Sequence, residues 1–424
     1  MPESQETAHY FSDASLCDEQ IEEVDVTYGF VVDKLIQGWP KFHQTAEKGV
    51  IKSVTLEKTT SIGCKPNMIR FIATLTTDEV LSAVIKVTSS MTCSIPGMPA
   101  AKPKEVSEKR DKDISEAQRK LHDGEAEFYQ RFSGESAIPG FPIHEIYYSR
   151  KFSDNQTEDA YIPPMLILED LTQVTHTVMK ELAEDQVKSI VKGFASLHKH
   201  ILCMKDEKWK DFLTGMNSDK MLMEKMAPSV DKGIEYFGDI YRRLHRVMTG
   251  EFINYATNDF SLQIGLPEML VHGFNPANVL FSNAEPSSIA AFADFQLVFL
   301  GSPAIDLERV ITLASHKYKD DPEARSKFET DNFAYYYEVL SRKMAEEGHE
   351  LTFTPEQLKR SYQLSKVICA ARNMAIYANS IKHLPQMPGA ISEEHMKGWQ
   401  DYVVAGGNEA VQILQQEAPE WLDE

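Results

Sequence analysis

The segment Val271–Phe281, VHGFNPANVLF, decides how the rest of the chain is interpreted. An apolar run, EMLVHG, leads into a His-Gly turn, and Asn278 opens a second short apolar run. A third run, IAAFA, ends at Asp294. Short apolar runs separated by turn residues are typical of β-strands. We therefore expect a small hairpin that places Asn278 and Asp294 at neighbouring strand ends.

The chain before this segment is rich in strand-like patterns. Residues 54–87 contain three short β-branched runs, SVTLEKTT, MIRFIATLT and LSAVIKVT, which predict a small antiparallel sheet. A helical pattern precedes them at 26–49, and another follows at 114–133. Two further strand-like runs, HEIYYSRKF and MLILEDL, lie at 144–152 and 165–171.

After Leu171 the chain is mostly helical, apart from the embedded hairpin. This order predicts an α+β, bilobal fold with a small antiparallel β-rich N-lobe and a larger helical C-lobe. We expect a flexible lead-in at 1–24, the N-lobe at 25–170 and the C-lobe at 171–424. A cleft between two lobes is the usual place for a small-molecule site.

Composition excludes several classes of partner. The chain has 424 residues and a formal net charge of -20, which argues against nucleic acid and against anionic membrane surfaces. The polar N-terminus and the lack of a long apolar run indicate a cytoplasmic protein without a membrane segment. The cysteines are few and scattered, which fits a reducing compartment: Cys17, Cys64, Cys93, Cys203 and Cys369.

Lys86 stands inside an apolar run, SAVIKV. Taken alone, it would be a solvent-facing lysine on an edge strand. The alternative is a lysine that reaches nucleotide phosphates, held in place by an ion pair with Glu125 in the 114–133 helix. Glu127 lies two residues further on and points to another face of that helix. Only one of the two carboxylates can therefore pair with Lys86.

Two further segments are candidates for nucleotide contacts. The run MLILEDL ends at two acids, so the backbone groups from Glu169 to Leu171 are candidates to bond an adenine ring. A plain strand end is the alternative. Between the first two strands, Gly63 and nearby hydroxyl groups could cap phosphates, although an ordinary hairpin turn is at least as consistent with one glycine.

Asn278 and Asp294 are the candidate metal ligands. An amide oxygen and a carboxylate at adjacent strand ends could share a hard cation such as Mg²⁺. Such a cation would bridge nucleotide phosphates and neutralise charge during transfer. Turn Asn and Asp residues are common in any hairpin, so the two residues together, after a His-Gly turn, carry the prediction.

Taken in order, Lys86, Glu125, ILEDL, VHG…N and ADFQLVFLGSPAIDL resemble the choline/ecdysteroid kinase-like branch of the aminoglycoside phosphotransferase superfamily. The sequence is most similar to the nematode-type group, CHK kinase-like or DUF1679, over residues 30–415. The resemblance implies a protein-kinase-like fold that binds ATP and Mg²⁺ and phosphorylates a small alcohol. Steroid-like, choline-like and xenobiotic alcohols are all compatible acceptors.

The resemblance also implies roles for single residues. Lys86 would hold phosphates and Glu125 would orient it, while Asn278 and Asp294 would bind magnesium. His272 would brace the catalytic loop, and Asp306 would anchor the helical lobe.

The sequence departs from this pattern at the catalytic loop. The family has His-Gly-Asp, four residues and then Asn, whereas here Phe274 follows Gly273 and the loop is one residue short. Asn275 could orient a hydroxyl but cannot act as a base, and Phe274 would add apolar bulk at the acceptor position. A lost base typically costs about 10²–10⁴ in rate.

Three explanations of the short loop are open. The protein could be a kinase of reduced activity, or it could be a catalytically inactive nucleotide- or metabolite-binding pseudokinase. One codon lost from the gene sequence would give the same pattern.

Overall fold

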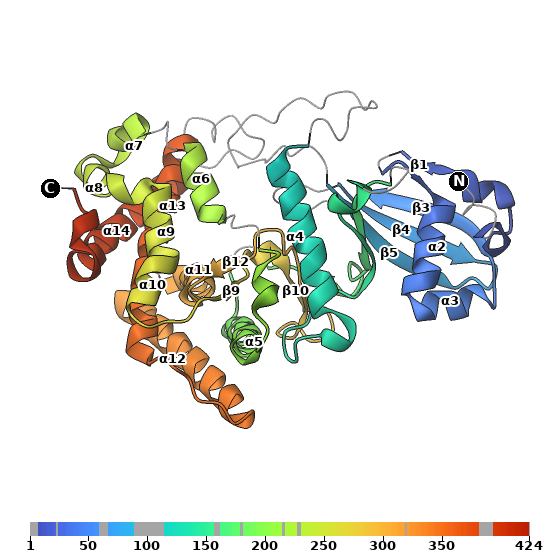
Figure 1. The fold of residues 1–424 in the computed structure, drawn as a ribbon. Helices are drawn as coiled ribbons and strands as arrows, with labels where there is room; N and C mark the ends of the chain where they lie inside the picture. The colour runs from blue at the N-terminus through green and yellow to red at the C-terminus, as the bar shows by residue number, and fades with distance from the viewer. Residues whose placement is uncertain are drawn as a thin grey trace. The chain divides into compact units, whose positions relative to one another are not determined.

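The computed structural model describes residues 7–22, 24–58, 67–88, 114–156, 162–178, 181–213, 217–226, 230–318, 320–380 and 393–423. They form two compact units (Figure 1). The first unit contains the described residues from 7 to 137 and Ile143–Thr175, and the second contains Ile138–Pro142 and the chain from His176 onward. The α+β class predicted from the sequence is confirmed, with a sheet-rich N-terminal part and a helical C-terminal part.

A five-stranded antiparallel sheet, in the order β3-β4-β5-β7-β6, forms the framework of the first unit. Its strands are β3 (Ile51–Lys58), β4 (Asn67–Leu75), β5 (Val80–Val87), β6 (Ile146–Arg150) and β7 (Met165–Glu169). Strand β5 is central, and Lys86 pairs in register with Met68 on one side and Leu166 on the other. The sequence order thus brings the Lys86 strand into the middle of the sheet.

The helices of the first unit are α2 (Tyr28–Gly38), α3 (Pro40–Ala46) and α4 (Glu116–Phe132). A capping box fixes the start of α4, because the Ser115 hydroxyl accepts from Gln118 N and Gln118 Oε1 accepts from Ser115 N. One face of this helix buries Leu121, Glu125, Phe128 and Phe132. The apolar spacing of the sequence therefore sets Glu125 on the buried side of α4.

The described part of the predicted flexible lead-in is packed rather than loose. Phe11, Cys17 and Ile21 are buried in the core of the first unit. Ser12 N also donates to Ile51 O at 2.8 Å, and β1 (Gln20–Ile21) pairs with β2 (Val26–Thr27). The composition of this segment did not predict the packing, because its few apolar residues are scattered in a polar, acidic stretch.

Short strands lie among the helices of the second unit. Strand β9 (Met269–Val271) pairs with β12 (Phe299–Gly301), and β10 (Val279–Ser282) pairs with β11 (Ile289–Phe292). Strand β8 (Thr175–His176) spans the point where the chain passes from the first unit to the second. The expected hairpin is therefore present, and Asn278 and Asp294 stand at neighbouring ends of β10 and β11.

Helices make up the rest of the second unit (Figure 1). They are α5 (Glu184–Cys203), α6 (Ser218–Met226), α7 (Val230–Phe237), α8 (Asp239–Arg243), α9 (Gly250–Asn254), α10 (Phe260–Gln263), α11 (Ala304–Ser315), α12 (Pro322–Glu346), α13 (Pro355–Ser380) and α14 (Glu393–Glu417). Within the described ranges, no helix combines the length and apolarity needed to cross a membrane.

Asp306, in the first turn of α11, fixes the backbone that follows β9. Its Oδ2 accepts from His272 N at 2.8 Å, and its Oδ1 accepts from Gly273 N at 2.9 Å and from Phe274 N at 3.1 Å. The carboxylate is fully buried. Three consecutive backbone amides thus depend on one side chain, which is the anchoring role that the family resemblance implied.

We expect Asp306→Asn to destabilise the protein, because its amide group offers one acceptor oxygen where the carboxylate offers two. Each buried amide left without an acceptor costs about 1–3 kcal/mol. The free energy of unfolding in urea would measure the loss. The control is Asp331→Asn, since Asp331 is an exposed residue of α12, and its effect should stay within about 0.5 kcal/mol. Equal stability of the two variants would contradict the anchoring role.

Candidate functional site

Lys86 and Glu125 form a buried ion pair in the first unit. Lys86 Nζ lies 2.7 Å from Glu125 Oε1, and their side chains are 5% and 0% exposed. The edge-strand interpretation of Lys86 is therefore wrong, since β5 is central and the lysine is buried. Glu127 instead pairs with Arg131 and Lys151, so the assignment of different helix faces to Glu125 and Glu127 is confirmed.

The burial of this pair is costly by itself. Desolvation of two charges usually offsets most of their mutual attraction, whereas removing one partner costs about 3–5 kcal/mol. A pair of this kind is therefore weak evidence for stability. The ion pair does, however, hold the Lys86 ammonium group in a fixed place on the central strand. A fixed ammonium group is suited to contact phosphate oxygens.

The segment from Glu169 to Leu171 is partly engaged in the fold of the first unit. Glu169 N donates to Glu145 O at 2.9 Å, so this amide is not available to a ligand. His144 Nδ1 lies 3.2 Å from Glu169 O, and the Thr175 hydroxyl donates to Leu171 O at 2.8 Å. Each carbonyl oxygen has a second lone pair. Of the backbone groups expected to contact adenine, only the Glu169 amide is therefore excluded, and both carbonyl oxygens can still accept a bond. Gly63, the other candidate for nucleotide contacts, lies outside the described residues.

His272 lies beneath the loop that follows β9. Its side chain is buried, and burial lowers the pKa of the imidazole. Its Nε2 lies 3.2 Å from Ala293 O, so the ring links β9 to the residue before Asp294. The ring therefore connects two backbone segments of the loop region.

The Phe274 side chain points into the core of the second unit. It is 5% exposed, and its ring packs edge-on against Phe194 at 6.2 Å. The Phe274 ring is therefore part of the packing of this unit, and its place relative to an acceptor stays a prediction. The next residue, Asn275, is exposed, and its Oδ1 accepts from Ala277 N at 3.0 Å. That bond makes Asn275 the cap of a short 3₁₀ turn that leads to Asn278.

Asn278 and Asp294 come together as predicted. Asn278 Nδ2 lies 3.4 Å from Asp294 Oδ2, and Ala293 N donates to Asn278 O at 2.9 Å. Asp294 adopts a left-handed backbone conformation with φ of 62°, which aspartate tolerates better than most residues. The described residues contain no cluster of three or more His, Cys, Asp or Glu side chains suited to a metal. Two oxygen-bearing side chains nevertheless fit Mg²⁺, which commonly takes only one or two protein ligands together with substrate phosphates and water.

A group of charged residues beside the loop was missed by the sequence reasoning. Arg309 Nη2 donates to Asp219 Oδ2 at 2.6 Å, and Arg372 Nη1 lies 3.2 Å from Asp219 Oδ1. Arg309 Nη1 would lie 3.3 Å from a Cβ atom added at Gly273, whose φ is +74°. Arg309 follows Asp306 by three residues in a helix, and this spacing places both side chains on one face. The spacing could therefore have indicated that Arg309 lies near Gly273.

The charge beside the short loop is therefore unusual. Burial alone would raise the pKa of Asp219, but the guanidinium groups of Arg309 and Arg372 hold this pKa below its usual range. A carboxylate bonded to two arginines is a poor base. Helix α11 thus places the Arg309 guanidinium group near Gly273.

Comparison with known proteins places the chain in a family. The model of the family DUF1679, described as "Uncharacterized oxidoreductase dhs-27", matches residues 83–404. The "Uncharacterized kinase-like protein D1044.1" of Caenorhabditis elegans is 27% identical over 202 residues, which cover 45% of this chain. The match spans 50% of that relative's length.

Two solved structures are similar at low identity. An aminoglycoside phosphotransferase of Alicyclobacillus acidocaldarius has 9% identity and a TM-score of 0.43, covering 86% of this chain and 92% of that one. A microcompartment-associated aminopropanol kinase has 13% identity and a TM-score of 0.41, covering 89% and 98%. The family model covers most of the chain, and the chain belongs to the DUF1679 family.

Proposed function

We propose that this protein binds Mg-ATP and is a small-molecule kinase-like protein that transfers phosphoryl groups to the hydroxyl of a small alcohol at a reduced rate. The observation that carries the proposal is the buried Lys86–Glu125 pair on the central strand. Because burial of such a pair contributes little to stability, binding of a phosphate ligand would explain why the pair is present. We further propose a cytoplasmic location, where ATP is abundant.

The other residues would divide the work as follows. Lys86 would contact phosphate oxygens, with Glu125 holding the ammonium group in place. Asn278 and Asp294 would hold Mg²⁺, which neutralises phosphate charge when bound. His272 and Asp306 would keep the loop in position without touching the nucleotide.

Reduced transfer follows from the loop. No acidic side chain occurs between His272 and Asn278. Asn275 uses its side-chain oxygen within the loop, and Asp219 is neutralised by two arginines. The same three facts favour the second candidate, an inactive nucleotide-binding pseudokinase, if turnover is absent.

An oxidoreductase activity, which the family description names, has less support. Dinucleotide-binding folds use parallel strands joined by helices. All pairings in the five-stranded sheet of this chain are antiparallel.

The first prediction concerns nucleotide binding. Mg-ATP at 100 times its Kd should stabilise the wild type by about 2.7 kcal/mol, which raises Tm by a few degrees. Asp294→Ala should lose the magnesium-dependent part of this shift because a metal ligand is gone. Differential scanning calorimetry with and without Mg²⁺ measures it, and Asp331→Ala serves as the control. A wild type that shows no shift would refute the nucleotide site.

The second prediction concerns the missing acid. Insertion of Asp between Gly273 and Phe274 should raise alcohol-dependent ATP turnover by about 10²–10⁴, the usual contribution of a general base. Turnover would be measured as ADP release over a panel of steroid-like, choline-like and xenobiotic alcohols. Insertion of Asn at the same point restores loop length without a base and is the matched control. Equal turnover of the two insertions would show that the missing carboxylate does not limit the rate.

A further inference from the structure

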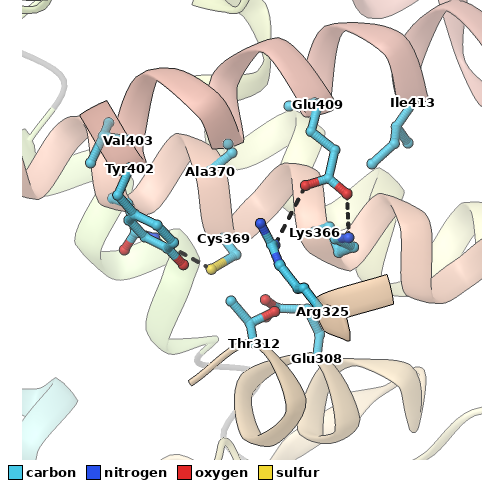
Figure 2. Close-up of a pocket in the computed structure, with 13 residues that line it drawn as sticks. Glu308, Thr312, Arg325, Lys366, Cys369, Ala370, Tyr402, Val403, Glu409 and Ile413 are labelled. Atoms are coloured by element: carbon cyan, nitrogen blue, oxygen red, sulfur yellow. Dashed lines mark hydrogen bonds and ion pairs between the residues drawn. The ribbon is translucent and has the colours of Figure 1, made fainter. Parts of the chain in front are cut away.

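A pocket lies within the helical unit, and none of the residues assigned above to nucleotide or metal lines it. Its walls come from α11, α12, α13 and α14 (Figure 2). Helix α12 contributes Arg325 alone, whereas the other three helices contribute positions spaced by three or four residues, which share one face. Glu308 and Thr312 of α11 form one such pair, and Lys366 and Ala370 of α13 form another. These faces carry both polar and apolar side chains, and they lie among the buried helices of the unit.

Glu308 forms the floor of the pocket. The residue is 2% exposed, and burial raises the pKa of its carboxyl. Its Oε1 is fully buried and accepts no hydrogen bond from any residue that the structure describes. The Thr312 hydroxyl and the Cys369 thiol line the same pocket, but neither donates to Oε1 with hydrogen-bond geometry. A buried acceptor left unpaired costs about 1–3 kcal/mol, so a donor from outside the chain has a defined place to bind.

The cations of the pocket are already paired. Lys366 contacts Glu329 and Glu409, and Arg325 contacts the same two carboxylates. Figure 2 shows the Glu409 carboxylate between the Arg325 and Lys366 side chains. Glu409 is 35% exposed and so lies at the rim, whereas Glu308 is at the bottom.

The charge around the pocket selects the class of ligand. Its two lining cations, Arg325 and Lys366, are already balanced by Glu329 and Glu409, and Glu308 leaves one carboxyl oxygen unpaired. A cationic ligand would add an unbalanced buried charge, and an anionic ligand would face the unpaired oxygen of Glu308. Buried unbalanced charges are strongly unfavourable. An uncharged hydroxyl group meets neither penalty.

The size of the pocket agrees with a small group. Its volume of about 20 Å³ holds little more than one water-sized group. We propose that this pocket is a binding site for the hydroxyl end of a small uncharged alcohol, with Glu308 Oε1 as the hydrogen-bond acceptor. The proposal goes beyond the nucleotide site, since it uses none of the residues assigned to ATP or Mg²⁺.

Three probes of similar size and different charge test the proposal: 2-fluoroethanol, 2-fluoroethylammonium and fluoroacetate. Their Kd values would be measured by ¹⁹F relaxation on the full chain without nucleotide. We expect 2-fluoroethanol to bind at least about tenfold more tightly than either charged probe. Tighter binding of a charged probe would overturn the proposal. The absence of binding by all three probes would also overturn it and would indicate that the pocket holds only an ordered water.

Variants place the binding in this pocket. Glu308→Leu removes the acceptor at similar volume and should weaken 2-fluoroethanol binding by about tenfold, the equivalent of one hydrogen bond. Glu338→Leu makes the same change on the exposed face of α12 and should leave the Kd unchanged. Unaltered binding in Glu308→Leu would overturn the assignment. Asp294→Ala should keep wild-type probe binding, so a failure of the nucleotide proposal is distinguishable from a failure of this one.

Discussion

The Asp306 carboxylate is the constraint on which the candidate loop depends. It accepts three consecutive backbone amides, from His272 to Phe274, and it is fully buried. His198 Nε2 lies 3.9 Å from the same carboxylate, and burial lowers the pKa of this histidine to about 4. The charge of Asp306 is therefore met mainly by oriented N–H dipoles rather than by a cation. Such bonds fix the direction of the backbone, which an ion pair to a flexible side chain would not do.

The two units use buried charge in different ways. In the first unit, Lys86 and Glu125 neutralise each other across a strand and a helix. In the second unit, Asp219 is shared between Arg309 and Arg372, and Asp306 is shared between three amides. Each of these groups is held in place by a buried hydrogen bond or ion pair. Rigid placement of charge is the property that phosphoryl transfer needs most, because its catalysis rests on positioning and electrostatics.

Much of the fold and part of the site followed from sequence patterns. The β-rich first unit, the helical second unit and the hairpin that joins Asn278 to Asp294 follow from apolar periodicity and turn residues, which are local signals. The sequence could not give the packing of the lead-in or the burial of Phe274, because both depend on cavities formed by distant segments. The Arg309–Asp219–Arg372 group joins residues of three helices, 153 positions apart at most, and no local pattern encodes such a contact.

The geometry of the short loop explains how the acidic residue could be lost without loss of structure. The amides of Gly273 and Phe274 bind Asp306 through the backbone, so their bonds do not depend on which side chain follows the glycine. An apolar side chain at that position gains a place against Phe194 in the core. The fold therefore gains apolar burial from Phe274 where a carboxylate would have served only the reaction. The structure of this loop therefore does not require an acidic side chain after Gly273.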